Sequence, residues 1–320
     1  MLVKEQIPEQ SFNTWFMPIV PVKLEDSTLT IQVPSQFFYE WLEENYVHIL
    51  QKVIQKVIGQ NGKLEYSEVM DNGSASNQPY TFKVGGKKFS SRLIVRTGKY
   101  KNLPECAKAI KISGADIVTV AVRRVNISDK NKPLLMDYIN PKKITYLPNT
   151  AGCFSSDEAL RTLRLAREIG GWKLVKLEVL GDKKNLFPEM IETLKSTEIL
   201  TKEGFKVMVY CNDDPLMAKR LENSGACAIM PLAAPIGSGL GIINEINIKI
   251  IRKQTKLPLI IDAGLGQASD AAIAMELGCD GVLVNTAIAK AKKPFQMALA
   301  FKNAVVALSL IHISEPTRPY

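Results

Sequence analysis

The chain has 320 residues, of which 46% are hydrophobic and 23% are charged, a balance typical of a soluble protein that buries a large core. No apolar run is long enough to cross a membrane, and Glu5, Glu9 and Asp26 interrupt the first segment. We therefore expect neither a membrane span nor a secretory signal, and place the protein in the cytoplasm. The net charge of +9 is spread along the chain without a basic block, which suits a small anionic ligand at least as well as a nucleic acid.

Histidine and cysteine are too sparse for several kinds of site. The 2 histidines are His48 and His312, so the segment between Tyr80 and Leu308 has no imidazole for a Ser-His-Asp triad, a Cys-His pair or a zinc site built on histidines. The 5 cysteines lie far apart and form no C-x-x-C motif, which argues against zinc and disulfide frameworks. We therefore predict no metal and no cofactor, and assign acid–base chemistry to lysine, aspartate and glutamate.

Residues 1–70 are predicted to form a small α+β domain of KH-like type. Apolar periodicity indicates a first helix around Trp15, a hairpin with strands over 22–24 and 29–33, a long helix from Ser35 and a last strand over 63–69. The segment 71–79 is polar, rich in small residues and without periodicity, which predicts a flexible linker and a domain boundary.

Three segments of this domain, Phe12–Phe16, Leu29–Pro34 and Phe37–Tyr46, resemble the amino-terminal domain of the bacterial replication initiator DnaA. The resemblance implies an assembly module that contacts other initiators and helicase-loading partners. The nucleotide-binding and DNA-reading parts of such an initiator have no counterpart in this sequence. Nucleic acid is therefore not an expected partner.

After Tyr80, strand-length apolar runs alternate with helix-length segments. The expected strands are 93–95, 117–121, 144–147, 174–179, 207–210, 228–230, 259–262 and 281–284. Eight β/α units in about 225 residues predict an α/β fold, a TIM (β/α)8 barrel over residues 80–308. A Rossmann-like sheet is the alternative, although no G-x-G-x-x-G follows the first strand.

Two opposite charges lie two residues apart on the expected strand 174–179. Strand side chains alternate, so Lys176 and Glu178 share one face. Parallel strands are covered on both faces, where charges are costly unless they are paired or lie at the open end of the sheet. This favours an amine nucleophile that forms an imine with a ketone or aldehyde, with the carboxylate moving protons beside it. A solvated strand end or a structural ion pair is the alternative.

Glycine-rich and polar loops follow the last three expected strands. They are 235–241, rich in glycine, then Asp262-Ala263-Gly264, then Asn285-Thr286. The carboxyl ends of barrel strands gather the reacting groups, often with a phosphate site after strands seven and eight. Without a Walker lysine or dinucleotide spacing, a monophosphate on a small sugar fits better than ATP or NAD. For the loop 235–241 alone, a turn that needs positive φ angles is an equal alternative.

From Phe89 to Val305 the sequence resembles thiazole synthase, the family that assembles the thiazole phosphate of thiamine. The resemblance rests on seven dispersed segments in one order: 97–100, 123–126, 149–153, 176–179, 235–239, 262–264 and 285–286. It implies a TIM barrel that condenses 1-deoxy-D-xylulose 5-phosphate, dehydroglycine and sulfur from the carboxyl-terminal thiocarboxylate of a sulfur-carrier protein. A separate enzyme would supply the dehydroglycine, and we also expect a homo-oligomer.

Individual roles also follow from the resemblance. It implies that Lys176 forms the imine and that Glu178 and Asp262 are the acid–base carboxylates. The residues that it implies for holding the sugar phosphate are Gly237, Ala263, Gly264, Asn285 and Thr286.

Two positions and both ends depart from this pattern. Arg96 and Ala233 stand where glycine is expected, and an arginine at the rim would either obstruct substrate or add attraction for anions. Residues 309–320 break the pattern of the last helix, which begins at Phe295, and resemble translated sequencing-adapter sequence. We expect a non-native tail and a shortened last helix. With the initiator-like head, this leaves open a chimeric sequence, or an inert barrel fused to an interaction module.

Overall fold

The computed structural model describes residues 3, 6–7, 11–12, 15–33, 36–68, 82–122 and 135–309. The chain divides into two compact units, one comprising Met1–Pro79 and the C-terminal segment from Ser309, the other Tyr80–Leu308. Each unit is described by itself. The expected linker 71–79 lies outside the described residues, as do 123–126 of the thiazole synthase resemblance and all but the first residue of the expected tail.

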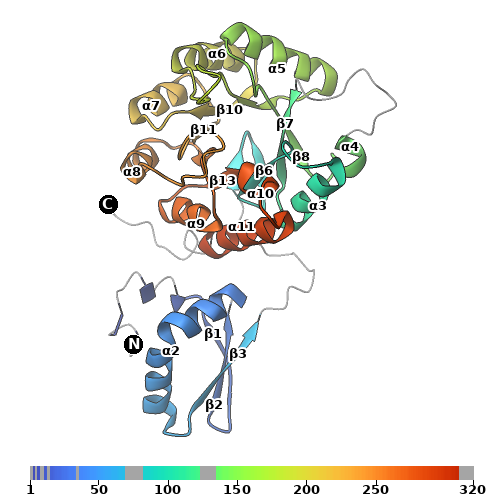
Figure 1. Cartoon of the computed structure of the whole chain (residues 1–320). Coiled ribbons are helices and arrows are strands. Elements are labelled where there is room, and N and C mark those ends of the chain that lie inside the picture. Colours follow the sequence, from blue (N-terminus) through green and yellow to red (C-terminus); the bar gives the residue numbers. More distant parts are fainter. Residues whose placement is uncertain are drawn as a thin grey trace. The chain divides into compact units, whose positions relative to one another are not determined.

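The first unit is a three-stranded sheet with one long helix. β1 (Val20–Glu25) pairs antiparallel with β2 (Thr28–Val33), and β3 (Lys63–Glu68) pairs parallel with β2, which is the central strand. The helix α2 (Gln36–Ile58) makes the crossover that a parallel β2–β3 pair needs, and it covers the sheet (Figure 1). The core contains Phe16, Ile31, Val33, Leu42 and Leu50. The prediction of a small α+β domain is confirmed.

The second unit is a barrel of parallel strands inside a ring of helices (Figure 1). The strands run β11-β10-β9-β8-β7-β6-β13-β12, and a parallel bridge between Ile229 and Leu259 joins the two ends of this order. Their bounds are β6 (Leu93–Arg96), β7 (Ile117–Ala121), β8 (Thr145–Asn149), β9 (Leu174–Leu177), β10 (Lys206–Cys211), β11 (Ala228–Pro231), β12 (Ile260–Ile261) and β13 (Gly281–Val284). The TIM barrel is confirmed, and the Rossmann-like alternative is wrong because the sheet closes on itself.

Helices follow the strands in the order that a (β/α)8 chain requires. Their bounds are α3 (Leu103–Ser113), α4 (Leu135–Tyr138), α5 (Ser156–Gly170), α6 (Met190–Lys202), α7 (Pro215–Asn223), α8 (Glu245–Gln254), α9 (Ala268–Glu276), α10 (Thr286–Ala289) and α11 (Pro294–Ser309). The last of these buries Phe301 and Val305 against the barrel. None of the helices in the described ranges is long and apolar enough to cross a membrane.

A hairpin that the sequence did not predict precedes the barrel. β4 (Phe82–Val84) and β5 (Lys87–Phe89) are joined by Gly85 and Gly86, both with positive φ angles. Its buried side chains, Phe82, Val84 and Phe89, pack in one cluster with inward residues of the strands, among them Ile94, Ile117, Leu147, Leu174 and Met208. Leu174 is the first residue of β9. The hairpin therefore fills the amino-terminal end of the barrel, opposite the ends at which functional residues gather.

The strands β13 and β6 approach each other closely at Gly281. A Cβ atom at this position would lie 2.5 Å from the backbone oxygen of Arg92. Because backbone cannot yield as a side-chain tip does, we expect Gly281→Ala to lower the free energy of unfolding of the barrel by about 1–3 kcal/mol. Thermal and urea unfolding followed by circular dichroism measure this loss.

Gly181→Ala is the matched control, since a Cβ there would meet its nearest neighbour at an ordinary 3.5 Å. Equal stabilities of the two variants would contradict the close approach.

Candidate active site

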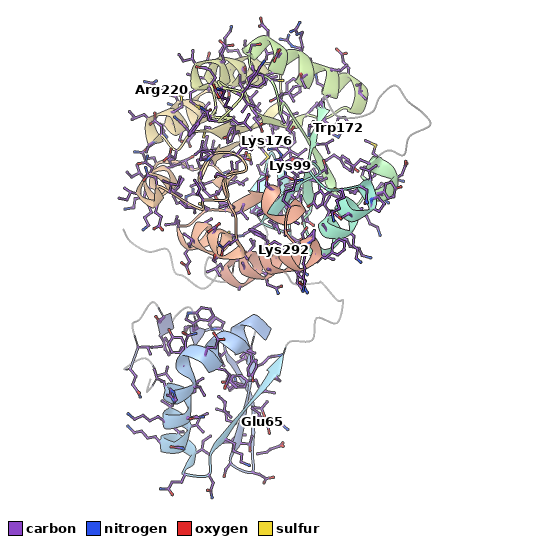
Figure 2. The ribbon with its side chains drawn as sticks, in the orientation of Figure 1. Glu65, Lys99, Trp172, Lys176, Arg220 and Lys292 are labelled. Atoms are coloured by element: carbon purple, nitrogen blue, oxygen red, sulfur yellow. The ribbon has the colours of Figure 1, made fainter. Side chains whose placement is uncertain are left out.

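Lys176, Glu178 and Asp262 meet at the carboxyl-terminal end of the barrel. Lys176 is the third residue of β9, Glu178 follows that strand, and Asp262 follows β12. The Lys176 Nζ lies 2.9 Å from Glu178 Oε2 and 2.8 Å from Asp262 Oδ2. The Lys176 side chain is completely buried and lies inside the ring of helices (Figure 2), so a solvated strand end is ruled out.

Arg96 adds a second cation to this cluster. It is the last residue of β6, its side chain is 15% exposed, and its guanidinium lies 3.6 Å from the same Oε2 atom of Glu178 that Lys176 contacts. This contact is made with a side chain of the chain itself, so whether Arg96 obstructs substrate or attracts an anion stays a prediction. The cluster of Lys176, Arg96, Glu178 and Asp262 carries two positive and two negative groups, so its charges balance.

Burial raises the pKa of the Asp262 carboxyl above its ordinary value. The positive charges of Lys176 and Arg96 oppose this shift, whereas the negative charge of Glu178 adds to it. The Asp262 carboxyl therefore holds its proton to a higher pH than an exposed aspartate does.

Tyr210 forms a wall beside the amine. It is fully buried on β10, and the Lys176 Nζ lies 5.1 Å from the centre of its ring. Burial also raises the pKa of the Tyr210 phenol, so the ring stays neutral. An aromatic face attracts an ammonium and excludes water from one side of it. Ala263 packs in the same apolar cluster as Tyr210, together with Leu180 and Leu232.

Thr150 fixes the backbone of Glu178. Its hydroxyl accepts a hydrogen bond from the Glu178 N–H at 2.7 Å and donates one to the Glu178 carbonyl at 2.8 Å. Thr150 directly follows β8, whose last residue Asn149 pairs with Lys176 across the sheet. The sequence placed Thr150 in the resemblance but gave it no role. A buried polar residue just beyond a barrel strand is the signal that could have singled it out.

The implied phosphate residues come from three loops. Gly237 follows β11 and Thr286 follows β13, and both line one pocket of about 330 Å³ together with Gly239, Gly266, Gln267 and Lys290. Gly264 has a φ of 89°, and a Cβ there would lie 2.4 Å from the Ala234 nitrogen, so only glycine fits. Asn285 has a buried Oδ1 atom with no hydrogen-bond partner among the described residues. Alanine replaces the expected glycine at position 233 without backbone strain, since Ala233 is not among the residues with a positive φ angle.

Lys99 was missed by sequence reasoning. It lies in the loop after β6, and its Nζ donates a hydrogen bond to the Thr286 hydroxyl at 3.0 Å. Its side chain is exposed, so a ligand from solvent can reach the ammonium. A basic residue after a glycine, in the first βα loop of an expected barrel, is the signal that could have found it.

No group of three or more His, Cys, Asp or Glu side chains in the described ranges is arranged to hold a metal ion. The acid–base cluster pairs two carboxylates with two cations instead.

Comparison with known proteins decides the family. The family described as thiazole biosynthesis protein ThiG matches residues 83–318. The chain belongs to the thiazole synthase family. A thiazole synthase of Pelagibacter ubique is 90% identical over 221 residues, which cover 69% of this chain and 86% of that protein. Another, from Paramagnetospirillum magneticum, is 59% identical over 260 residues, or 81% of this chain and 80% of the relative.

The chain is also similar to a solved structure. The chain aligns with the Amycolatopsis orientalis BexX/CysO complex at a TM-score of 0.67 and 29% identity, covering 76% of this chain and 99% of that one. The family match extends into the predicted non-native tail, so the origin of that segment stays a prediction. Residues 2–56 match the DnaA N-terminal domain, which confirms the second resemblance.

The charge balance of this thiazole synthase site predicts a pH-dependent stability for Lys176→Met. Without the ammonium, Glu178 and Asp262 are buried carboxylates with less compensation, and the already raised pKa of Asp262 rises further. A carboxyl group with a raised folded-state pKa holds its proton longer when folded, so stability falls as pH rises. We expect a loss of about 3–5 kcal/mol at pH 8 and a much smaller loss at pH 5, measured by urea unfolding.

Lys173→Met is the control, because Lys173 is exposed and precedes the same strand. A loss that is equal at both pH values would show that packing, and not charge, determines the stability of the Lys176→Met variant.

Proposed function

We propose that Lys176 forms an imine with the ketone of 1-deoxy-D-xylulose 5-phosphate, and that this intermediate combines with dehydroglycine and sulfur to give thiazole phosphate. Membership of the family supplies the reaction class. The observation that carries the mechanism is the buried Lys176 Nζ, held within 2.9 Å of two carboxylates at the catalytic end of the barrel. The glycine-rich and polar loops after β11, β12 and β13 favour a ligand site over a purely structural ion pair, because an ion pair alone does not require such loops.

The first step is a proton transfer. An ammonium is no nucleophile, so Lys176 passes a proton to Asp262, whose pKa is raised by burial. Lys176 and Asp262 are then both neutral, and Arg96 with Glu178 remains as a balanced ion pair. Because the charges stay balanced before and after the transfer, the buried site can hold the free amine at little electrostatic cost.

The amine then adds to the ketone carbon, and a proton moves from the nitrogen to the former carbonyl oxygen, which becomes a hydroxyl group. A second proton, from Asp262, lets this group leave as water, and Asp262 becomes a carboxylate again. One amine, one ketone and one proton thus give one protonated imine and one water. Glu178, whose backbone Thr150 holds in place, is the base for the carbon next to the imine in the tautomerisation that follows.

Sulfur would arrive on the carboxyl-terminal thiocarboxylate of a sulfur-carrier protein. The solved relative supports a protein partner, since its structure is a complex of BexX with CysO. Dehydroglycine would come from a separate enzyme. We also propose that the protein is a homo-oligomer and that it is located in the cytoplasm.

Borohydride trapping tests the imine. Incubation with 1-deoxy-D-xylulose 5-phosphate followed by reduction should add one dehydrated, reduced sugar phosphate to the intact mass of the chain. Lys176→Ala should form no adduct. Peptide mapping of the trapped chain should locate the modification on Lys176.

Lys173→Ala is the matched control, a lysine at the other end of the same strand, and it should trap as the natural chain does. No adduct with the natural chain, or an adduct that survives Lys176→Ala, would refute the imine.

The first unit supports a second candidate function, protein–protein association. It matches the DnaA N-terminal domain, and its edge strand β1 exposes Val20, Val22 and Leu24, each by more than half. An exposed apolar edge strand is a template for pairing with another chain.

Charged substitutions on this strand test the association. We expect the double variant Val22→Lys, Leu24→Lys to abolish a concentration-dependent rise in mass, measured by sedimentation equilibrium of the full chain. Lys23→Ser, on the same strand, should leave the rise unchanged. If the double variant and the natural chain associate alike, β1 is not the contact surface.

A further inference from the structure

We infer that Lys99 is a further substrate-binding residue, whose ammonium pairs with the phosphate of the substrate between the loops after β11 and β13. The inference rests on the proposed function and extends it, because it assigns binding of the substrate phosphate to Lys99. It does not depend on imine chemistry. A sugar monophosphate that never reacted with Lys176 would use the same contact.

The order of strands brings Lys99 to this place. β6 pairs with β13 through Leu93 with Val282 and Val95 with Val284, so the loop after β6 leaves the barrel beside the loop after β13. The Lys99 Nζ lies 3.0 Å from the Thr286 Oγ1 atom. It is also 3.4 Å from the position that a Cβ atom on Gly237 would take. The ammonium therefore lies where three loops converge, and Figure 2 shows Lys99 inside the ring of helices.

The backbone of Lys99 is held in an uncommon conformation. Its φ angle is 71°, in the left-handed region that few residues other than glycine adopt. Glycine would fit this turn without strain, yet the chain has a lysine there. Strained backbone of this kind clusters at ligand sites, where the fold fixes the direction of a side chain. The direction here is toward Thr286 and Gly237, both in the wall of the 330 Å³ pocket.

The charge of a phosphate group explains why a lysine at position 99 would be favourable. A phosphate monoester carries nearly two negative charges near neutral pH. The acid–base cluster offers no net attraction, because Lys176 and Arg96 are balanced by Glu178 and Asp262. Lys290 is among the residues that line the pocket, and the Lys99 ammonium lies beside the pocket wall at Thr286 and Gly237. These lysines are two cations that the described residues place at the pocket for a dianion. The Lys99 ammonium already donates a hydrogen bond to the Thr286 hydroxyl.

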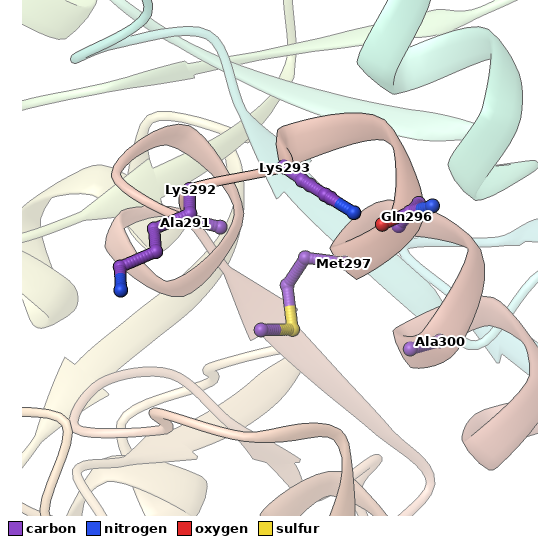
Figure 3. A pocket seen from close by; sticks show the side chains of 6 residues that line it. All are labelled: Ala291, Lys292, Lys293, Gln296, Met297 and Ala300. Atoms are coloured by element: carbon purple, nitrogen blue, oxygen red, sulfur yellow. The ribbon is translucent and has the colours of Figure 1, made fainter.

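The lysines of a neighbouring pocket are not arranged to bind a phosphate as Lys99 is. This pocket has a volume of about 530 Å³ and is lined by Ala291, Lys292, Lys293, Gln296, Met297 and Ala300. The ammonium groups of Lys292 and Lys293 extend in different directions, with Met297 between them (Figure 3). They do not converge on one point as a phosphate requires. Lys292 is therefore a suitable control lysine.

Isothermal titration calorimetry tests the inference with two probes, 1-deoxy-D-xylulose 5-phosphate and its dephosphorylated form. Loss of one charge-assisted contact should weaken binding of the phosphorylated probe by about ten- to a hundredfold in Lys99→Met. Binding of the dephosphorylated probe should not change. Lys99→Arg should recover most of the affinity, and Lys292→Met should bind both probes as the natural chain does.

Lys99→Gly separates binding from folding. Glycine adopts a φ of 71° without strain, so this variant should keep its thermal stability while it loses affinity for the phosphorylated probe. Unchanged affinity in Lys99→Met and Lys99→Gly overturns the inference, and so does a natural chain that binds no phosphorylated probe. If Lys176 traps no sugar but binding depends on Lys99, the imine mechanism fails and the inference stands.

Discussion

A buried ammonium between two carboxylates is the constraint on which the rest of the barrel depends. Lys176 reaches the interior because β9 is covered on both faces, and it is tolerated there because Glu178 and Asp262 come from the ends of β9 and β12 to meet it. Bringing strands that are far apart in sequence to one rim requires a closed barrel. Closure, in turn, depends on small residues where strands and loops crowd, such as Gly281 against Arg92 and Gly264 against Ala234.

Arg96 changes the charge balance of the cluster of Lys176, Glu178 and Asp262. With glycine at its position, Lys176 would be the single cation of this cluster, facing two carboxylates. The guanidinium shares the Oε2 atom of Glu178 with Lys176 and leaves the charges even. Lys99, three residues further along, donates a hydrogen bond to Thr286 in the wall of the 330 Å³ pocket. The short segment from Arg96 to Lys99 therefore reaches both the buried charge cluster and this pocket.

Much of this architecture could be read from the sequence, because hydrophobic periodicity is local. The barrel strands were each predicted within a few residues, and alternation along 174–179 placed Lys176 and Glu178 on one face. The hairpin β4–β5 was not predicted. Its strands are three residues long, and each has too few positions to show alternation of apolar and polar residues. The contacts of Arg96 and Lys99 were also beyond reach. They depend on which strands become neighbours when the sheet closes, and on side-chain directions that no spacing encodes.

The hairpin of the second unit fills the amino-terminal end of the barrel. Phe82, Val84 and Phe89 close this end, so among the described residues access to Lys176 is from the opposite rim. In the reaction proposed above, a sugar phosphate bound near Lys176 would lie below any later ligand, and a protein tail bound first at the rim would block its entry. Access from one end would then require the small substrate to bind before the protein partner.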